Sequence, residues 1–147
     1  MEFTARENLE SCKTLLSILA HKIKAANSLN LTDASVAAEN FFRGLLNRLY
    51  GWNLANINIS SQNAAAIDLG CSIHRVAVQV TSSTGAGKIR SSAKGFAQRN
   101  LQTSYDRLIF VYPTMERPKL KTEFTADFPP GFGFDPSRDI LCFTDLL

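Results

Sequence analysis

The sequence predicts a mixed α/β domain, in which helices cover a mixed β-sheet. Two long amphipathic helical patterns open the chain, the apolar period then changes to that of strands, and a third helical pattern separates two of the later strands. The predicted order of elements is α-α-β-β-β-α-β-loop-β. One β-hairpin thus precedes a crossover helix, and such a helix joins parallel strands of one sheet.

The length and composition fit one globular domain over residues 1–147. The chain has 147 residues, of which 45% are hydrophobic and 20% charged. No apolar run reaches the roughly 18–20 residues that span a bilayer, and the first ten residues lack the apolar segment of a signal peptide. Three scattered cysteines favour free thiols in a reducing compartment. We therefore expect a cytoplasmic protein without a membrane partner.

Basic residues concentrate in the middle of the chain. Residues 71–121 hold nine basic and two acidic side chains, residues 1–70 hold six of each, and residues 122–147 hold one basic and five acidic. A basic middle suits a polyanion such as DNA, bound through its phosphates. A solvated helix and loop surface would give the same balance.

Residues 5–26 are expected to form the first helix. Its apolar positions recur at alternating steps of three and four, at Leu9, Cys12, Leu16, Leu19, Ile23 and Ala26. This stripe can pack on the domain, and its spacing is also close to that of a coiled-coil seam, which would bind a partner helix or a second copy of the chain.

The second helix is expected from Thr32, a suitable N-cap, to Tyr50, with Gly51 as its stop. Its core stripe is Ala38, Phe41, Phe42, Leu45, Leu46 and Leu49. Glu39 lies beside this stripe, where an acid can serve a site or simply reach water.

Five strands and a third helix are expected after the second helix. Their ranges are residues 54–59, 65–69, 75–81, 107–112 and 140–143 for the strands and residues 88–105 for the helix. The second and third strands form a hairpin with a loop at residues 70–74. Because side chains alternate along a strand, Gln79 and Thr81 share the face opposite to that of Val78.

The main candidate catalytic and metal-binding residues lie on this hairpin. Nuclease cores of the αβββαβ, PD-(D/E)xK type hold Mg²⁺ or Mn²⁺ with an acid on one strand and a D/E-x-K pair on the next, assisted by a helix acid. Glu39 and Asp68 occur in that order, and a hairpin would turn Asp68 and Gln79 to one face. Gln79 stands in place of the second acid and Thr81 in place of the lysine.

These positions suggest a division of roles. Asp68 and Gln79 would bind the metal, Glu39 would assist through water, and Lys88 could replace the missing lysine. Arg90, Lys94 and Arg99 would contact DNA phosphates without reading sequence. Alternatively, Gln79 and Thr81 are ordinary half-buried strand residues and Asp68 stabilises a turn.

Several segments resemble the SMEK-type domain of bacterial conflict systems. They are AAIDLG (65–70), VAVQVTSSTGAGKI (76–89), YDRLIFVY (105–112) and FGFDPSRDIL (132–141), and residues 40–63 are similar too. The resemblance extends from about residue 5 to the end and implies a restriction-endonuclease-like fold, in a module fused to other domains of anti-phage defence proteins. Asp68 matches the strand acid of the family, Gln79 and Thr81 the QxT of VQVTS, and Lys88 the following lysine. Cys71 departs from the pattern, because another acid is expected there, and the loss of that carboxylate weakens metal binding.

The sequence therefore supports two functional hypotheses. The first is a metal-dependent, nuclease-like effector domain that acts on DNA in bacterial defence, leaning towards a Mg²⁺-dependent endodeoxyribonuclease with a degenerate site. The second is a catalytically inactive nuclease fold used for nucleic-acid or protein recognition and assembly. An unrelated α/β interaction domain would follow if Asp68 and Gln79 lay on opposite faces. The ending DILCFTDLL suggests a domain cut from a longer, multidomain protein.

Overall fold

The computed structural model describes residues 4–29, 32–57, 67–83, 85–120, 124 and 127–147. Within these residues, five strands form one mixed sheet in the order β1-β2-β3-β4-β5. The strands are β1 (Ala55–Asn56), β2 (Leu69–Cys71), β3 (Val76–Val80), β4 (Arg107–Val111) and β5 (Ile140–Leu141). The pairs β1–β2 and β2–β3 are antiparallel, whereas β3–β4 and β4–β5 are parallel. The predicted mixed sheet is confirmed.

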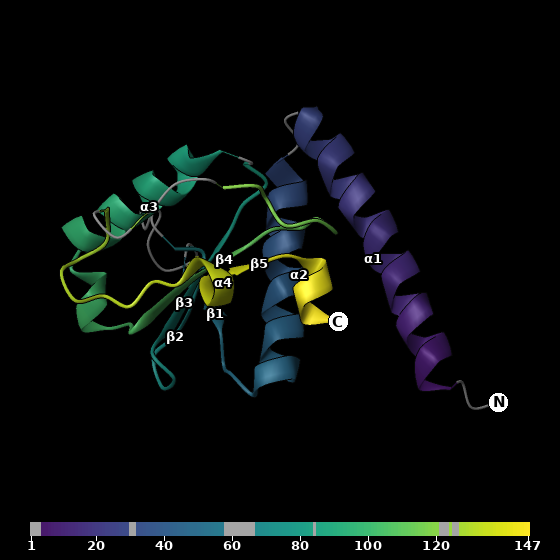
Figure 1. Cartoon of the computed structure of the whole chain (residues 1–147), viewed down its shortest axis with the longest axis horizontal. Helices are drawn as coiled ribbons and strands as arrows, with labels where there is room; N and C mark the ends of the chain where they lie inside the picture. The colour runs from purple at the N-terminus through teal and green to yellow at the C-terminus, as the bar shows by residue number, and fades with distance from the viewer. Residues whose placement is uncertain (1–3, 30–31, 58–66, 84, 121–123, 125–126) are drawn as a thin grey trace.

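Helices cover both faces of this sheet. They are α1 (Ala5–Ser28), α2 (Thr32–Tyr50), α3 (Ala86–Gln98) and the short α4 (Pro136–Asp139), with 3-10 turns η1 (Leu101–Thr103) and η3 (Phe143–Leu146). Figure 1 shows α1 and α2 on one side of the strands and α3 on the other. The predicted element order holds among the described residues, where sequence patterns missed the short α4 and the 3-10 turns.

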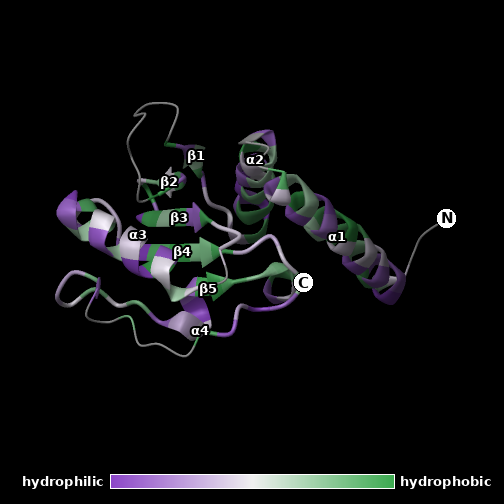
Figure 2. Cartoon of the chain, turned by 90° about the horizontal axis from the view of Figure 1, so that it is seen from above, coloured by the Kyte–Doolittle hydropathy of each residue, from purple (hydrophilic) through white to green (hydrophobic). Residues whose placement is uncertain are grey.

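Two apolar cores result from the alternation of side chains along β3 and β4. Val78 and Ile109 face α2, where they meet Phe42, whereas Ala77 and Phe110 face α3. Figure 2 shows the apolar colouring of these central strands. A strand that is covered on both faces has a continuous apolar sequence. The apolar run at residues 107–112 therefore predicts a central strand, as observed for β4.

The α1 helix packs on the domain through its second half. A capping box between Thr4 and Glu7 fixes its start, and Ile23 is its buried residue. Leu9 and Leu15 are 38% and 66% exposed, and Figures 1 and 2 both show the N-terminal end of α1 extending away from the sheet. In the predicted stripe, Leu9 and Cys12 are therefore exposed. Leu16 and Leu19 are partly buried against the core, and Ile23 is buried. In the part of the chain that the structure describes, neither α1 nor any other helix has the length and hydropathy needed to cross a membrane.

The hairpin prediction is confirmed with a shifted boundary. Gly70 and Cys71 were expected in the loop but belong to β2, and Gly70 pairs with Ala77. A Cβ atom on Gly70 would lie 2.6 Å from the Tyr105 hydroxyl oxygen, so the glycine permits close packing inside a strand. Residues 65–66 of the predicted first strand lie outside the described residues.

The third helix is shorter than predicted at its C-terminal end. It was expected over residues 88–105 but spans Ala86–Gln98, because Asn100 adopts a left-handed conformation with φ of 54°. The edge strands are also shorter: β1 covers two residues of the expected 54–59, of which 58–59 lie outside the described residues, and β5 ends at Leu141 because η3 follows.

Gly51 ends α2 as predicted. Its φ is 69°, and its N–H donates to the Asn47 carbonyl at 3.0 Å. We expect Gly51→Ala to lower the free energy of unfolding by about 1 kcal/mol, because a Cβ atom disfavours left-handed backbone. Gly44→Ala, inside α2 with open space around the added Cβ, is the matched control and should raise it by about 0.5–1 kcal/mol. Urea unfolding measures both, and an equal effect of the two substitutions would contradict the assignment of Gly51 as a C-cap.

Candidate active site

Asp68 lies where β2 begins, at a break in the alternation of side chains. Ile67 packs in the core under α3, although Leu69, two residues later, packs in the core under α2. The Asp68 N–H donates to the Val78 carbonyl at 2.9 Å, and the Asp68 carboxylate accepts from the Val80 N–H at 2.8 Å. The carboxylate is thereby fixed, 8% exposed, at the end of β3.

Glu39 reaches this carboxylate from α2. The pKa of Glu39 is raised to about 7 by burial, by the negative charge of Asp68 and by a hydrogen bond between the two side chains. Near neutral pH, Glu39 is therefore partly protonated, and its protonated form can donate to the Asp68 carboxylate. The sequence placed Glu39 beside the core stripe, and the structure brings it into contact with Asp68.

Gln79 lies in β3 between Val78 and Val80, the two residues whose backbone groups form hydrogen bonds with Asp68. Its neighbours Val78 and Val80 face the α2 side, so Gln79 follows Ala77 on the α3 side of β3. Gln79 is 5% exposed, and its Oε1 has no hydrogen-bond partner among the described residues. A buried amide oxygen without a partner costs about 1–3 kcal/mol. This cost makes Gln79 a candidate ligand for a group that the protein binds.

Thr81 has a structural role at the end of β3. Its hydroxyl accepts from the Ser83 N–H at 3.1 Å, and its own N–H donates to the Val111 carbonyl at 3.0 Å. These bonds shape the chain between β3 and α3.

The profile of the SMEK domain family matches residues 11–147. The chain belongs to the SMEK domain family. All the candidate residues lie within the matched range. Neither the curated proteins nor the solved structures contain a significant match to the chain.

The predicted DNA-contacting residues of the SMEK domain lie on α3 or at its C-cap. Lys88 is half-buried in the first turn of this helix, Lys94 is exposed further along it, and Arg99 is exposed at its C-cap. Arg90 is within 3.6 Å of the Asp127 carboxylate. Because α3 covers the face opposite to α2, the exposed cations on α3 belong to the layer opposite to the one that carries Glu39.

Cys71, the departure from the family pattern, lies in the core under α2. Burial raises the pKa of its thiol, but backbone N–H groups of His74 and Asn53 and the His74 imidazole, 3.5 Å from Sγ, lower it to about 7. Cys71 therefore forms a local pair with His74 in the hairpin turn.

The donor atoms near Asp68 suit a hard divalent cation. The described residues contain no group of three His, Cys, Asp or Glu side chains that could hold a metal. Mg²⁺ needs fewer protein ligands, since one or two carboxylates and retained waters commonly hold it. Glu39 and Asp68 provide carboxyl oxygens only, which fits Mg²⁺ or Mn²⁺ and not zinc, and Gln79 adds an unpaired amide oxygen on the α3 side of β3.

Glu39→Gln should alter the pH dependence of stability. The folded-state pKa of about 7 exceeds the unfolded value of 4.5, so protonation of Glu39 stabilises the fold fully below pH 4.5, and this contribution is lost as the pH rises through 7. Glutamine can donate to Asp68 without ionising. In the presence of chelator, we expect the variant to match the wild type below pH 4.5 and to be about 1–2 kcal/mol more stable above pH 8, after allowance for solvent screening. Parallel curves of unfolding free energy against pH would contradict the raised pKa of Glu39.

Proposed function

We propose that this SMEK domain is a nuclease-like module that acts on DNA and binds Mg²⁺ or Mn²⁺ through Glu39 and Asp68. The supporting observation is the contact between a helix carboxyl group and a strand carboxylate at the end of β3. A helix acid followed by a strand acid on a hairpin, then a crossover helix and a buried parallel strand, is the arrangement expected of a restriction-endonuclease-like core.

Each residue of this site would have a separate role in binding the cation or the phosphate. Two backbone hydrogen bonds hold Asp68 in place, so its carboxylate is a fixed ligand, whereas Glu39 would release its proton on binding a cation. Gln79 would supply a neutral oxygen to the cation or to a bound water. Lys88 would offset charge on a phosphate. The cation would neutralise the scissile phosphate and acidify a water molecule.

The family context extends this proposal to the whole protein. We base this extension on the resemblance of the chain to SMEK-type domains of bacterial conflict systems. We propose that the domain is the DNA-directed part of a larger defence protein, with its trigger in an attached domain.

Cleavage of supercoiled plasmid DNA tests the proposed function. The protein is incubated with Mg²⁺, with Mn²⁺, or with chelator, and Mn²⁺ binding is measured separately by calorimetry. We expect nicking only with a divalent ion and a Mn²⁺ affinity that falls at lower pH, because Glu39 must lose its proton. Absence of both Mn²⁺ binding and cleavage by the folded protein would refute the proposal.

A second candidate function is recognition or assembly without catalysis. The Thr81 hydroxyl is engaged in a turn at the position of the usual lysine, and α1 exposes Leu15 and Ile18. A folded protein that oligomerises, loses oligomers in Leu15→Glu/Ile18→Glu, and cleaves no DNA would favour this candidate. Light scattering after size-exclusion chromatography provides the oligomeric state.

A further inference from the structure

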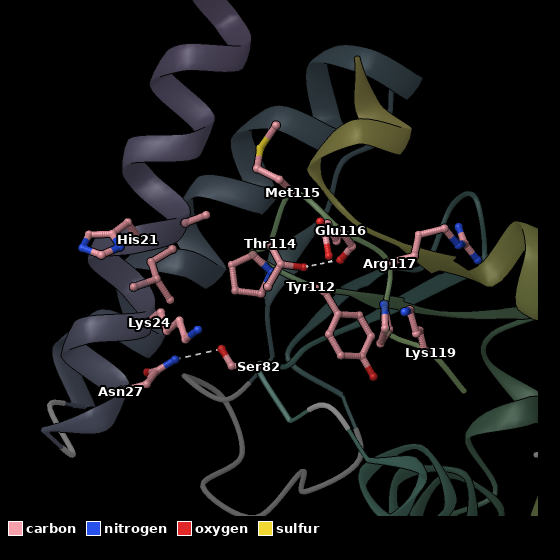
Figure 3. Close-up of a pocket in the computed structure, with 14 residues that line it drawn as sticks. His21, Lys24, Asn27, Ser82, Tyr112, Thr114, Met115, Glu116, Arg117 and Lys119 are labelled. Atoms are coloured by element: carbon pink, nitrogen blue, oxygen red, sulfur yellow. Dashed lines mark hydrogen bonds between the residues drawn. The ribbon is translucent and has the colours of Figure 1, made fainter. Parts of the chain in front are cut away.

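A groove lies at the carboxyl ends of the parallel strands β3 and β4. Its volume is about 870 Å³, and it runs between the second half of α1 and residues 112–119, with Ser82 at one end. Figure 3 shows His21, Lys24 and Asn27 on the α1 wall and a hydrogen bond of 2.8 Å between Asn27 and Ser82. Open α/β sheets bind ligands at the carboxyl ends of their strands, so this is a favourable place for a binding site.

The charge of the groove favours an anionic ligand. Lys24 approaches from α1, and Arg117 and Lys119 belong to the opposite wall, against the single acid Glu116. Arg117 is held by the Asp145 carboxylate at 3.0 Å. Among the described residues, neither Lys24 nor Lys119 forms an ion pair, so both ammonium groups can bind phosphates.

One end of the groove lies close in the chain to the Glu39–Asp68 carboxyl pair. Ser82 follows Val80, whose N–H donates to Asp68, by two residues, which separates them by at most about 7 Å. Tyr112, which also lines the groove, directly follows Val111, the register partner of Val80. A strand of nucleic acid lying in this groove would therefore have one end near the carboxyl pair, whereas a strand bound on the outer face of α3 would lie across the sheet from α2.

We propose that the groove binds the sugar-phosphate chain of a short single-stranded DNA segment and delivers it to the Glu39–Asp68 pair; this inference rests on the proposed function. A volume within the range of small-ligand pockets admits a short run of unpaired nucleotides rather than a duplex. The apolar walls formed by Ile23, Pro113 and Met115 suit the faces of unstacked bases, while Lys24 and Lys119 contact the phosphates.

Fluorescence anisotropy with a labelled oligodeoxythymidine of about 12 nucleotides tests the inference in the presence of chelator. Lys24→Glu/Lys119→Glu is compared with Lys94→Glu/Arg99→Glu on α3, which makes the same change of charge. We expect the groove variant to raise Kd roughly tenfold or more and to make the slope of log K against log salt shallower by about 1.4, the contribution of two phosphate contacts to a single strand. Because the groove would take the place of the contacts expected from sequence on α3, the α3 variant should stay within about twofold of the wild type. Circular dichroism verifies that both variants fold.

Three outcomes would overturn the inference. They are a larger loss in the α3 variant than in the groove variant, equal displacement of the oligonucleotide by polyglutamate, and tighter binding of duplex than of single strand. Because chelator excludes the metal, binding in the groove without any Mn²⁺ binding or cleavage would uphold the groove and refute the proposed function. Cleavage that depends on Asp68, together with binding through α3, would uphold the proposed function and refute the groove.

Discussion

Asp68→Asn is expected to abolish divalent-ion-dependent DNA cleavage while leaving the protein folded. Asparagine has nearly the same shape, and its Oδ1 can still accept the Val80 N–H that Asp68 accepts at 2.8 Å. The negative charge that would hold the cation is lost. Loss of an outer partner of a metal site already costs about 10–100-fold, so removal of a ligand should lower the cleavage rate about 100-fold or more. Rates of plasmid nicking at saturating Mg²⁺ or Mn²⁺ measure the effect.

Two comparisons separate this functional loss from a structural one. Asp68→Ala also removes the acceptor of the Val80 N–H, so it should additionally lower the free energy of unfolding by about 1–3 kcal/mol. Asp106→Asn, at an exposed carboxylate paired with Arg75, is the charge-matched control and should cleave normally. Cleavage by Asp68→Asn at the wild-type rate would exclude Asp68 as a ligand.

The helices and the central strand could be predicted because their signals are local. Residues at helical spacing form the buried face of α2, and Gly51 supplies the positive φ that ends it. The continuous apolar run of β4 reflects two covered faces. These patterns lie within one element, so sequence alone contains the information.

The boundaries of the hairpin and of α3 could not be predicted because they depend on distant contacts. Gly70 fits into β2 beside the side chain of Tyr105, 35 residues later, because it has no Cβ atom. Asn100 tolerates a left-handed backbone, and α3 ends there although the apolar spacing continues to Leu101. A helical period cannot show such an ending.

From the sequence, only the order of the site residues along the chain could be predicted. The sequence gives Glu39 and Asp68 in the order expected of a nuclease core, but the contact between them depends on how α2 crosses the end of β3. The groove joins residues 20–27, 82 and 112–119. Lys24 and Lys119 are 95 positions apart and carry no motif, so their role as a pair required the structure.

Asp139→Ala should cause the largest loss of stability among the polar substitutions. Asp139 is 1% exposed and accepts from Arg107 at 3.0 Å, from Arg138 at 2.7 Å and from the Asp135 N–H at 2.9 Å. Removal of one partner from a buried ion pair costs about 3–5 kcal/mol. The Arg107 and Arg138 side chains are 30% and 49% exposed, so solvent would recover part of this cost, and we expect about 2–4 kcal/mol in urea unfolding.

Asp135→Ala is the matched control in the same short helix. Asp135 is exposed and caps α4 through the Ser137 N–H at 3.0 Å, so its removal should cost clearly less than that of Asp139. An Asp139→Ala loss no larger than the Asp135→Ala loss would contradict the ion-pair argument.

The effect of Asp139 should extend from stability to binding. The ion pair with Arg107 joins α4 to β4, and the segment after α4 supports the groove wall, because Leu141 accepts from the Tyr112 N–H and Phe143 donates to Thr114, both at 2.8 Å. We therefore expect Asp139→Ala to weaken oligonucleotide binding under conditions where the protein is still folded, whereas Asp135→Ala should not. This follows because backbone hydrogen bonds to β5 and η3 hold the groove wall, and Asp139, directly before β5, is tied to the start of β4 through Arg107.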